Sequence, residues 1–234
     1  MLTGCKSCLV IAAHADDETL GAGGTIARLS RAGCRVTVAI ATDSTSAQYQ
    51  NDAAAMRRRR AQTNNALEIL GVHQHIQGDF PDMRLDQVPH VELNQWVASC
   101  IALSEADMVL VHHPADVNLD HQRLFASTLV ATRPTPGHGV RTVLSYFVNS
   151  ATEWGLLNPS ATARFVVFSD IASTLHVKLR ALGAYDDEVR EAPHPRSIEA
   201  VEAFCRSSGA VAGLHAAEPF EVVRMIWGSM RCES

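Results

Sequence analysis

Two short polar segments, each directly behind an apolar run, hold residue types that bind metal ions. The apolar residues 9–13 lead into His14–Glu18, which contains one histidine and three carboxylates. About a hundred residues later, the apolar residues 109–111 precede a segment that ends with Asp120 and His121. If both runs are parallel strands, their carboxyl ends open into one crevice of an α/β sheet. Two histidines and one aspartate meeting there form a three-ligand site with an open position, as in catalytic zinc enzymes.

The spacing of these residues indicates a role for each. His14 and Asp17 are three positions apart across a strand-to-helix turn, so both can face the crevice, and His121 completes the ligand set. Such nitrogen and oxygen donors suit Zn²⁺, although another divalent metal such as Fe²⁺ accepts the same set. Asp16 is directed differently and is placed to accept a proton from water that the metal activates. The adjacent carboxylates repel one another, which also favours a bound cation.

The rest of the chain alternates apolar runs with segments of helical periodicity. This order predicts a Rossmann-like three-layer α/β fold, with a mainly parallel sheet and helices on both faces. The predicted strands are Cys8–Ala13, Cys34–Ala41, His73–Gln77, Met108–Val111, Thr142–Phe147, Phe165–Phe168 and Phe220–Ile226. The predicted helices are Asp17–Ala32, Ala53–Leu70, Val91–Ser104, a helix after His121 to Ala131, Ile171–Leu182 and Ile198–Cys205, with a loop at 78–82. No repeat or linker divides the 234 residues, so we expect a single domain, 1–234.

The composition argues against several classes of partner. A net charge of −5 and a pI near 6.1 give no electrostatic reason to expect nucleic acid or an anionic membrane. No apolar run is long enough to span a bilayer, and the N-terminus does not resemble a signal peptide, so we expect a soluble cytoplasmic protein. Cys5 and Cys8 form a C-x-x-C without the second pair of a zinc cage. We expect these and the other four cysteines, Cys34, Cys100, Cys205 and Cys232, to be reduced thiols.

Two other functions fit parts of the pattern. Gly21 and Gly23 follow the first strand as in a dinucleotide-binding loop, but Ile26 occupies the position of the third glycine. Carboxylates also stand where a pyrophosphate would meet the helix, so these glycines are more consistent with close helix–sheet packing. A non-haem iron oxygenase uses two histidines and a carboxylate and remains an alternative.

The sequence resembles the PIG-L/LmbE-type N-deacetylases, zinc enzymes that remove acetyl groups from amino sugars and related glycoconjugates. The similarity covers nearly the whole chain, through residues 13–25, 66–71, 80–86, 112–121, 144–146, 152–154, 193–197 and 218–221. It implies that His14, Asp17 and His121 are zinc ligands and that Asp16 is the general base. It also implies an N-acetylated sugar or glycoconjugate as substrate and a homo-oligomer, often a trimer or hexamer.

Two departures from the family pattern affect the site. Ala15 replaces the usual proline, which loosens the turn because proline fixes φ. Asn118 stands where many members carry a histidine; its amide can donate a hydrogen bond to an oxyanion but cannot supply a proton. The proton for the leaving amine must then come from elsewhere. His194 is one candidate, although it could equally be a surface-loop residue, and Asp16 is the other once it has taken the proton of water.

Other polar residues are candidates for substrate contact. Arg60 is a candidate by analogy with the family, whereas the run Arg57–Arg60 spreads around a helix and forms no basic stripe. Asp82 and Arg84 could contact substrate or form a structural ion pair. Strand alternation turns His112 and His113 to opposite sides, so one of them faces the crevice. His113 is the candidate for substrate contact, but the sequence leaves open which of the two it is.

Overall fold

The computed structural model describes residues 4–45, 52–135 and 138–228, which contain a seven-stranded sheet. The strands are β1 Ser7–Ala12, β2 Arg35–Thr42, β3 Gln74–Phe80, β4 Met108–His112, β5 Thr142–Tyr146, β6 Phe165–Asp170 and β7 Ala217–Met225. Their order across the sheet is β3-β2-β1-β4-β5-β7-β6. The first five in that order are parallel, and β7 runs antiparallel to both of its neighbours. All seven predicted strands are therefore present, and the sheet is mainly parallel.

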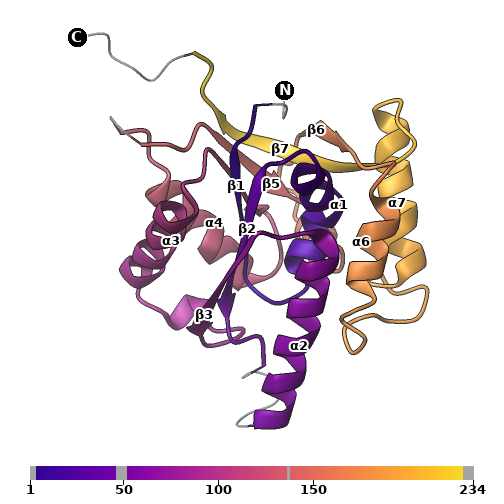
Figure 1. The fold of residues 1–234 in the computed structure, drawn as a ribbon, viewed down its shortest axis with the longest axis horizontal. Helices are drawn as coiled ribbons and strands as arrows, with labels where there is room; N and C mark the ends of the chain where they lie inside the picture. The colour runs from indigo at the N-terminus through magenta and orange to yellow at the C-terminus, as the bar shows by residue number, and fades with distance from the viewer. Residues whose placement is uncertain (1–3, 46–51, 136–137, 229–234) are drawn as a thin grey trace.

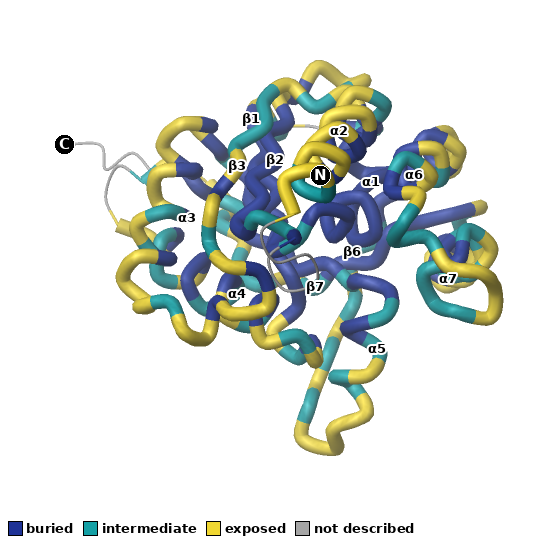
Figure 2. The backbone as a smooth tube through the Cα atoms, turned by 90° about the horizontal axis from the view of Figure 1, so that it is seen from below, coloured by how far each residue is buried: buried dark blue, intermediate teal, exposed yellow. Residues whose placement is uncertain are grey.

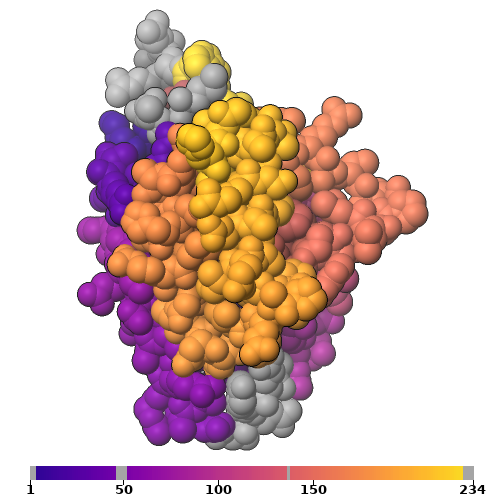
Figure 3. All heavy atoms as spheres, turned by 90° about the vertical axis from the view of Figure 1, so that its right-hand side faces the viewer, coloured from indigo at the N-terminus to yellow at the C-terminus, as the bar shows by residue number. Residues whose placement is uncertain are grey.

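Helices cover both faces of the sheet, which confirms the predicted three-layer α/β fold (Figure 1). The helices are α1 Asp17–Arg31, α2 Ala53–Leu70, α3 His90–Ser104, α4 Leu119–Ala131, α5 Thr152–Gly155, α6 Leu175–Leu182 and α7 Ile198–Val211, with a 3₁₀ turn η1 at Leu85–Gln87. Alternate side chains of β1 enter two separate cores: Val10 belongs to the core shared with α1, α2, α6 and α7, whereas Ile11 belongs to the core shared with α3 and α4. Burial is densest along the central strands and α1 (Figure 2), and α7 lies beside α6 on the outside (Figure 3).

Several boundaries differ from the sequence-based expectation. Helix α4 begins before His121, because the Asn118 side chain accepts a hydrogen bond from the Asp120 N–H and caps the helix. Residues 171–174 form a turn and not the start of α6, since the Asp170 carboxylate accepts the Ala172 N–H at 3.0 Å. Strand β3 continues through the predicted loop as far as Phe80, paired with β2. Helix α7 extends to Val211, and β7 begins at Ala217.

The glycines of α1 bring this helix close to its neighbours. A Cβ atom on Gly21 would overlap the ring of Tyr146 in β5, and one on Gly24 would lie 2.8 Å from Ile171 side-chain atoms. The interpretation of close helix–sheet packing is thereby confirmed at Gly21, whereas a Cβ atom on Gly23 would lie 3.2 Å from Lys178 Cγ in α6. The amino end of α1 is held tightly against the sheet, where the polar segment 14–18 begins.

A buried ion pair ties α1, α6 and β7 together. Lys178 Nζ lies 2.6 Å from Glu218 Oε1, and each of the two residues is 1% exposed. Glu218 also accepts hydrogen bonds from the backbone N–H groups of Gly24 and Thr25, at 2.9 and 2.7 Å. Lys178 donates a second hydrogen bond to the Leu20 carbonyl at 2.6 Å. The Lys178 ammonium and the Glu218 carboxylate are therefore each paired with the other and hydrogen-bonded to the backbone of α1.

No helix in the described part of the chain is long and apolar enough to cross a membrane. The described cysteines are free thiols, in line with the expectation of reduced cysteines. Cys5 Sγ and Cys34 Sγ lie 3.2 Å apart, whereas Cys232 lies outside the described residues.

Replacing Lys178 with methionine should lower the free energy of unfolding by about 3–5 kcal/mol, because Glu218 would remain buried without a countercharge. Urea denaturation followed by circular dichroism measures the loss. The matched control is Arg35→Met, which removes an exposed ion pair with Glu105 and should cost less than about 1 kcal/mol. Equal effects of the two substitutions would contradict this role of the buried pair.

Candidate metal centre

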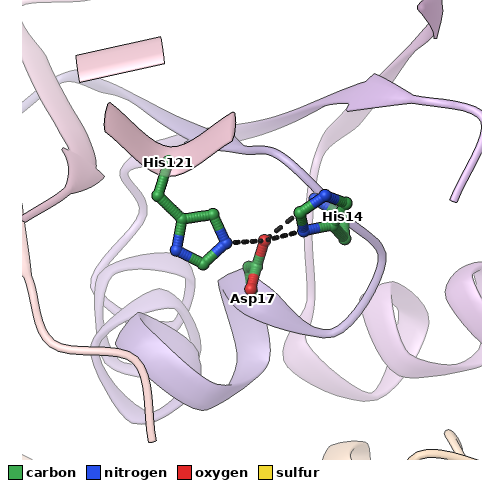
Figure 4. Close-up of side chains that lie close together, drawn as sticks. All are labelled: His14, Asp17 and His121. Carbon is green, nitrogen blue, oxygen red and sulfur yellow. Dashed lines mark hydrogen bonds and ion pairs between the residues drawn. The ribbon is translucent and has the colours of Figure 1, made fainter. Parts of the chain in front are cut away.

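The three predicted metal ligands converge at the carboxyl ends of β1 and β4, which are adjacent in the sheet. His14 follows β1, Asp17 is the first residue of α1, and His121 lies in the first turn of α4. One ligand atom from each residue lies within 4.8 Å of the other two. Figure 4 shows both imidazole rings directed at the Asp17 carboxylate. The strand order thus brings together residues that are about a hundred positions apart in the sequence.

The His121 ring fits a metal ligand better than a hydrogen-bond donor. Its Nε2 lies 3.2 Å from Asp17 Oδ2, and its Nδ1 lies 3.0 Å from Asp116 Oδ2. Neither contact is aligned as a hydrogen bond, and both ring nitrogens are buried without a hydrogen-bond partner among the described residues. The spacing of His121 Nε2 and Asp17 Oδ2 is one that two ligands of the same cation could have. The residues present therefore fit a divalent metal ion.

The His14 ring is oriented by a second carboxylate. Its Nε2 is hydrogen-bonded to Asp120 Oδ2 at 3.0 Å and lies 3.3 Å from Asp82 Oδ1. Asp120 is itself held in place, because its other oxygen accepts the Leu85 N–H at 2.9 Å. The opposite ring nitrogen, Nδ1, is left to face Asp17 Oδ2 at 3.3 Å. Carboxylates that fix a histidine in this way set its tautomer and orientation for metal binding.

His112 ends β4 and His113 follows it. Of the two, His112 lies against the three predicted metal ligands His14, Asp17 and His121, which we call the metal-ligand group. Its ring stacks on His121 with the centroids 3.8 Å apart, and its Nε2 accepts the Ala13 N–H at 2.9 Å. His113 is turned away, fully buried, with Nε2 2.9 Å from Glu221 Oε2. It lines neither of the two cavities at this edge of the sheet. Its position gives no support to the predicted substrate contact.

The adjacent carboxyls of Asp16 and Asp17 differ in their electrostatic surroundings. Burial raises the pKa of Asp17, but the imidazoles of His121 and His112 outweigh it and hold that pKa well below the usual range. Burial raises the pKa of Asp16 to about 7, against the opposing effect of the Arg196 guanidinium. Asp17 is thus kept ionised beside the histidines, whereas Asp16 has the proton affinity of a group that can exchange a proton near neutral pH.

A strained turn presents Asp16. Its backbone has φ 113°, a value that residues with a side chain rarely adopt. The buried Glu18 side chain supports the turn by accepting the Asp16 N–H at 3.1 Å. Glu18 is held in turn by the hydroxyls of Tyr185, at 2.9 Å, and Thr19, at 2.6 Å. Glu18 therefore acts as a support for the turn.

Ala15 makes a contact that the usual proline could not make. Its backbone N–H donates to Ser44 Oγ at 2.9 Å, whereas proline has no N–H. Ser44 follows the carboxyl end of β2 and lines the cavity beside the metal-ligand group. The substitution therefore exchanges a fixed φ for a hydrogen bond to the neighbouring strand end.

A cavity of about 250 Å³ opens beside the metal-ligand group. Four predicted site residues line it, namely His14, Asp16, Asp82 and Asn118. A second cavity of about 240 Å³ shares three lining residues with the first and includes Arg60. Arg84 is exposed and lines neither cavity. The predicted contacts by Asp82 and Arg60 thus have a suitable location, whereas Arg84 has none.

His194 does not line either cavity, although its loop does reach the site. The His194 Nδ1 accepts the backbone N–H of Arg196 at 3.0 Å, and it is the Arg196 side chain that enters the cavity. Arg196 Nη1 lies 3.1 Å from Asp16 Oδ2. Arg196 lies within the segment 193–197 that carries the family resemblance, but no local pattern indicates its partner 180 positions away. Asp116 and Asp120, which orient the histidines, belong to the segment that the motif already identified.

Comparison with known proteins places this chain in a family. The family model of the PIG-L proteins, described as GlcNAc-PI de-N-acetylase, matches residues 9–132, just over half of the chain. The protein is also 31% identical over 139 residues to an uncharacterized deacetylase, YaiS, of Escherichia coli K12, across 56% of this chain and 70% of that protein. The chain therefore belongs to the PIG-L family of deacetylases, which supports a hydrolase that acts on amide bonds.

Solved structures with the same fold have more than one activity. N,N′-diacetylchitobiose deacetylase from Pyrococcus horikoshii superposes with a TM-score of 0.75 at 18% identity, covering 95% of this chain and 85% of that one. The 4-carboxy-2-hydroxymuconate hydratase GalB from Pseudomonas putida KT2440 gives a TM-score of 0.76 at 21% identity, covering 96% and 98%. At such identities the similarity shows the fold alone. The reaction must therefore be argued from the site.

Asp120→Asn should weaken zinc binding by about 10–100-fold, because the neutral amide no longer fixes the His14 ring as a carboxylate does. Competition with a chromogenic chelator measures the affinity. Asp86→Asn, an exposed position in η1, is the matched control and should bind zinc like the unchanged protein. An unaltered affinity in Asp120→Asn would remove the orienting role of this carboxylate.

Proposed function

We propose that this protein is a zinc-dependent hydrolase that removes an N-acetyl group from an amino sugar or a related glycoconjugate. The observation that carries the proposal is the convergence of His14, Asp17 and His121 on one point, with the ring nitrogens of His121 buried and without hydrogen bonds among the described residues. Membership of the PIG-L family supports the same reaction class.

Each residue at the site has a task in this reaction. A zinc ion held by His14, Asp17 and His121 would lower the pKa of a bound water molecule towards neutrality and would polarise an acyl carbonyl. Asp16 lines the cavity and accepts the proton of the attacking water. Asp120 holds the His14 ring by a hydrogen bond, and Asp116 Oδ2 lies 3.0 Å from Nδ1 of the His121 ring. In this proposal Asp16 transfers the proton, and the adjacent Asp17 binds the metal.

Asn118 can stabilise negative charge but cannot deliver a proton. Its Oδ1 accepts the Asp120 N–H at 2.9 Å and its Nδ2 donates to Met83 Sδ at 3.6 Å, so the second N–H of Nδ2 is available to donate to a substrate oxygen in the cavity. His194, the other candidate for the acid, lines neither cavity. Asp16, having taken a proton from water, is therefore the group that we assign to protonate the leaving amine.

The other two functions are less well supported. At the amino end of α1, where a dinucleotide would place its pyrophosphate, Asp17 and Glu18 are buried carboxylates that repel phosphate. A non-haem iron oxygenase shares the ligand set, but its substrate turnover would require oxygen. Metal content after anaerobic purification, together with oxygen dependence, separates that function from hydrolysis.

Zinc-loaded protein should release acetate from at least one member of a panel of N-acetylated sugars, and a chelator should abolish the release. Asp16→Asn should keep the metal and lower kcat by about 100-fold or more, because the amide cannot accept the proton. An enzymatic acetate assay measures acetate release and kcat, and metal analysis of the same samples measures the bound zinc. Turnover by Asp16→Asn at the normal rate would refute the assignment of the base, and absence of release across the panel would refute the substrate class.

His121→Ala should lose zinc, because removal of one of three protein ligands leaves an incomplete site. Metal analysis after dialysis measures the loss. His138→Ala is the control, since that histidine contacts the Ala131 carbonyl far from the ligand group. If His121→Ala retained stoichiometric zinc, His121 would not be a ligand.

A further inference from the structure

The backbone around Arg196 is fixed just before helix α7. Ser197 caps this helix by accepting the Ala200 N–H at 3.1 Å, and the Arg196 N–H is held by His194 Nδ1 at 3.0 Å. The side chain leaves this anchored position and lines the cavity that also contains His14 and Asp16. Its entry into the site is thus set by local hydrogen bonds on both sides of the residue.

The guanidinium of Arg196 is held between two carboxylates. Its Nη1 lies 3.1 Å from Asp16 Oδ2 and 3.2 Å from Glu188 Oε2. Glu188 is fixed from its other side by an ion pair with Arg59, a buried residue of α2. The chain of contacts Arg59–Glu188–Arg196–Asp16 therefore runs from the wall of the cavity to the carboxylate beside the metal ligands.

Asp16 needs such a partner because of where it lies. It is 2% exposed, and the next two residues are the buried carboxylates Asp17 and Glu18. An ionised carboxylate in this position is destabilised both by burial and by its neighbours. Arg196 supplies a compensating charge, and its contact with Oδ2 restricts the rotation of the carboxylate.

We propose that Arg196 is a positioning residue, which holds the Asp16 carboxylate in the orientation that accepts the proton of the attacking water. This role rests on the proposed function, in which Asp16 is the base. The Glu188 and Arg59 side chains fix Arg196 in turn, so the ion-pair chain is a support for Asp16 that extends to α2.

The pairing is tested first by thermal unfolding, which does not depend on activity. In zinc-containing buffer, Arg196→Met should lower Tm by about 4–8 °C, because it leaves a buried carboxylate without its partner. Adding Asp16→Asn to this variant should restore at least half of the loss. Arg206→Met, which removes an exposed ion pair with Glu202 on α7, is the matched control and should show no such coupling with Asp16→Asn. Additive effects of Arg196→Met and Asp16→Asn would overturn the proposal.

The second test separates positioning from structural support. With a substrate found in the acetate-release panel, Arg196→Met should lose about 10–100-fold in kcat with zinc content unchanged and KM changed far less. Guanidinium at a non-denaturing concentration should restore part of the kcat of Arg196→Ala, whereas Arg206→Met should behave like the unchanged protein. Normal kcat in Arg196→Met would overturn the role of Arg196 while leaving the deacetylase proposal intact. If no substrate is turned over, the deacetylase proposal fails, and the unfolding cycle still decides the Arg196–Asp16 pairing.

Discussion

The constraint on which this structure depends is the burial of three consecutive carboxylates, Asp16, Asp17 and Glu18, where β1 meets α1. Each carboxylate is compensated in a different way. Asp17 faces imidazole nitrogens, Asp16 faces Arg196, and Glu18 accepts hydrogen bonds from hydroxyls and from the backbone. Because buried charge without compensation is costly, the surrounding elements must hold their partners in place. Much of the fold around α1 can be understood as meeting that requirement.

The compensation reaches well beyond the residues that contact the metal-ligand group. Asp120 joins the His14 ring to the backbone of η1, and Asp116 joins the His121 ring to Thr152 of α5. On the opposite side of α1, the Lys178–Glu218 pair fixes the helix to α6 and β7. The site is therefore built on elements that are themselves anchored by buried polar contacts. Such anchoring favours a preorganised geometry, which a metal site and a positioned base both need.

Proteins that share this architecture do not all share one reaction. The same architecture is shared by a deacetylase and by a hydratase, so the sheet and its helices do not set the reaction. In this chain, Ala15 donates a hydrogen bond to Ser44, and Asn118 places an amide where many members carry a histidine. These departures leave the predicted metal ligands unchanged and alter groups that line the cavity beside them.

The sequence by itself determined the alternation of strands and helices and the identity of the metal-ligand candidates, because both are local patterns. His14 and Asp17 are three residues apart, and His121 follows its own apolar strand, so parallel pairing was enough to predict their convergence. Only the tertiary structure decided that His112 and not His113 faces the ligands, and that Arg196 and not His194 enters the cavity. The physical reason is that these contacts join segments about a hundred or more positions apart, and the direction of a side chain across such a distance depends on packing that no local pattern records.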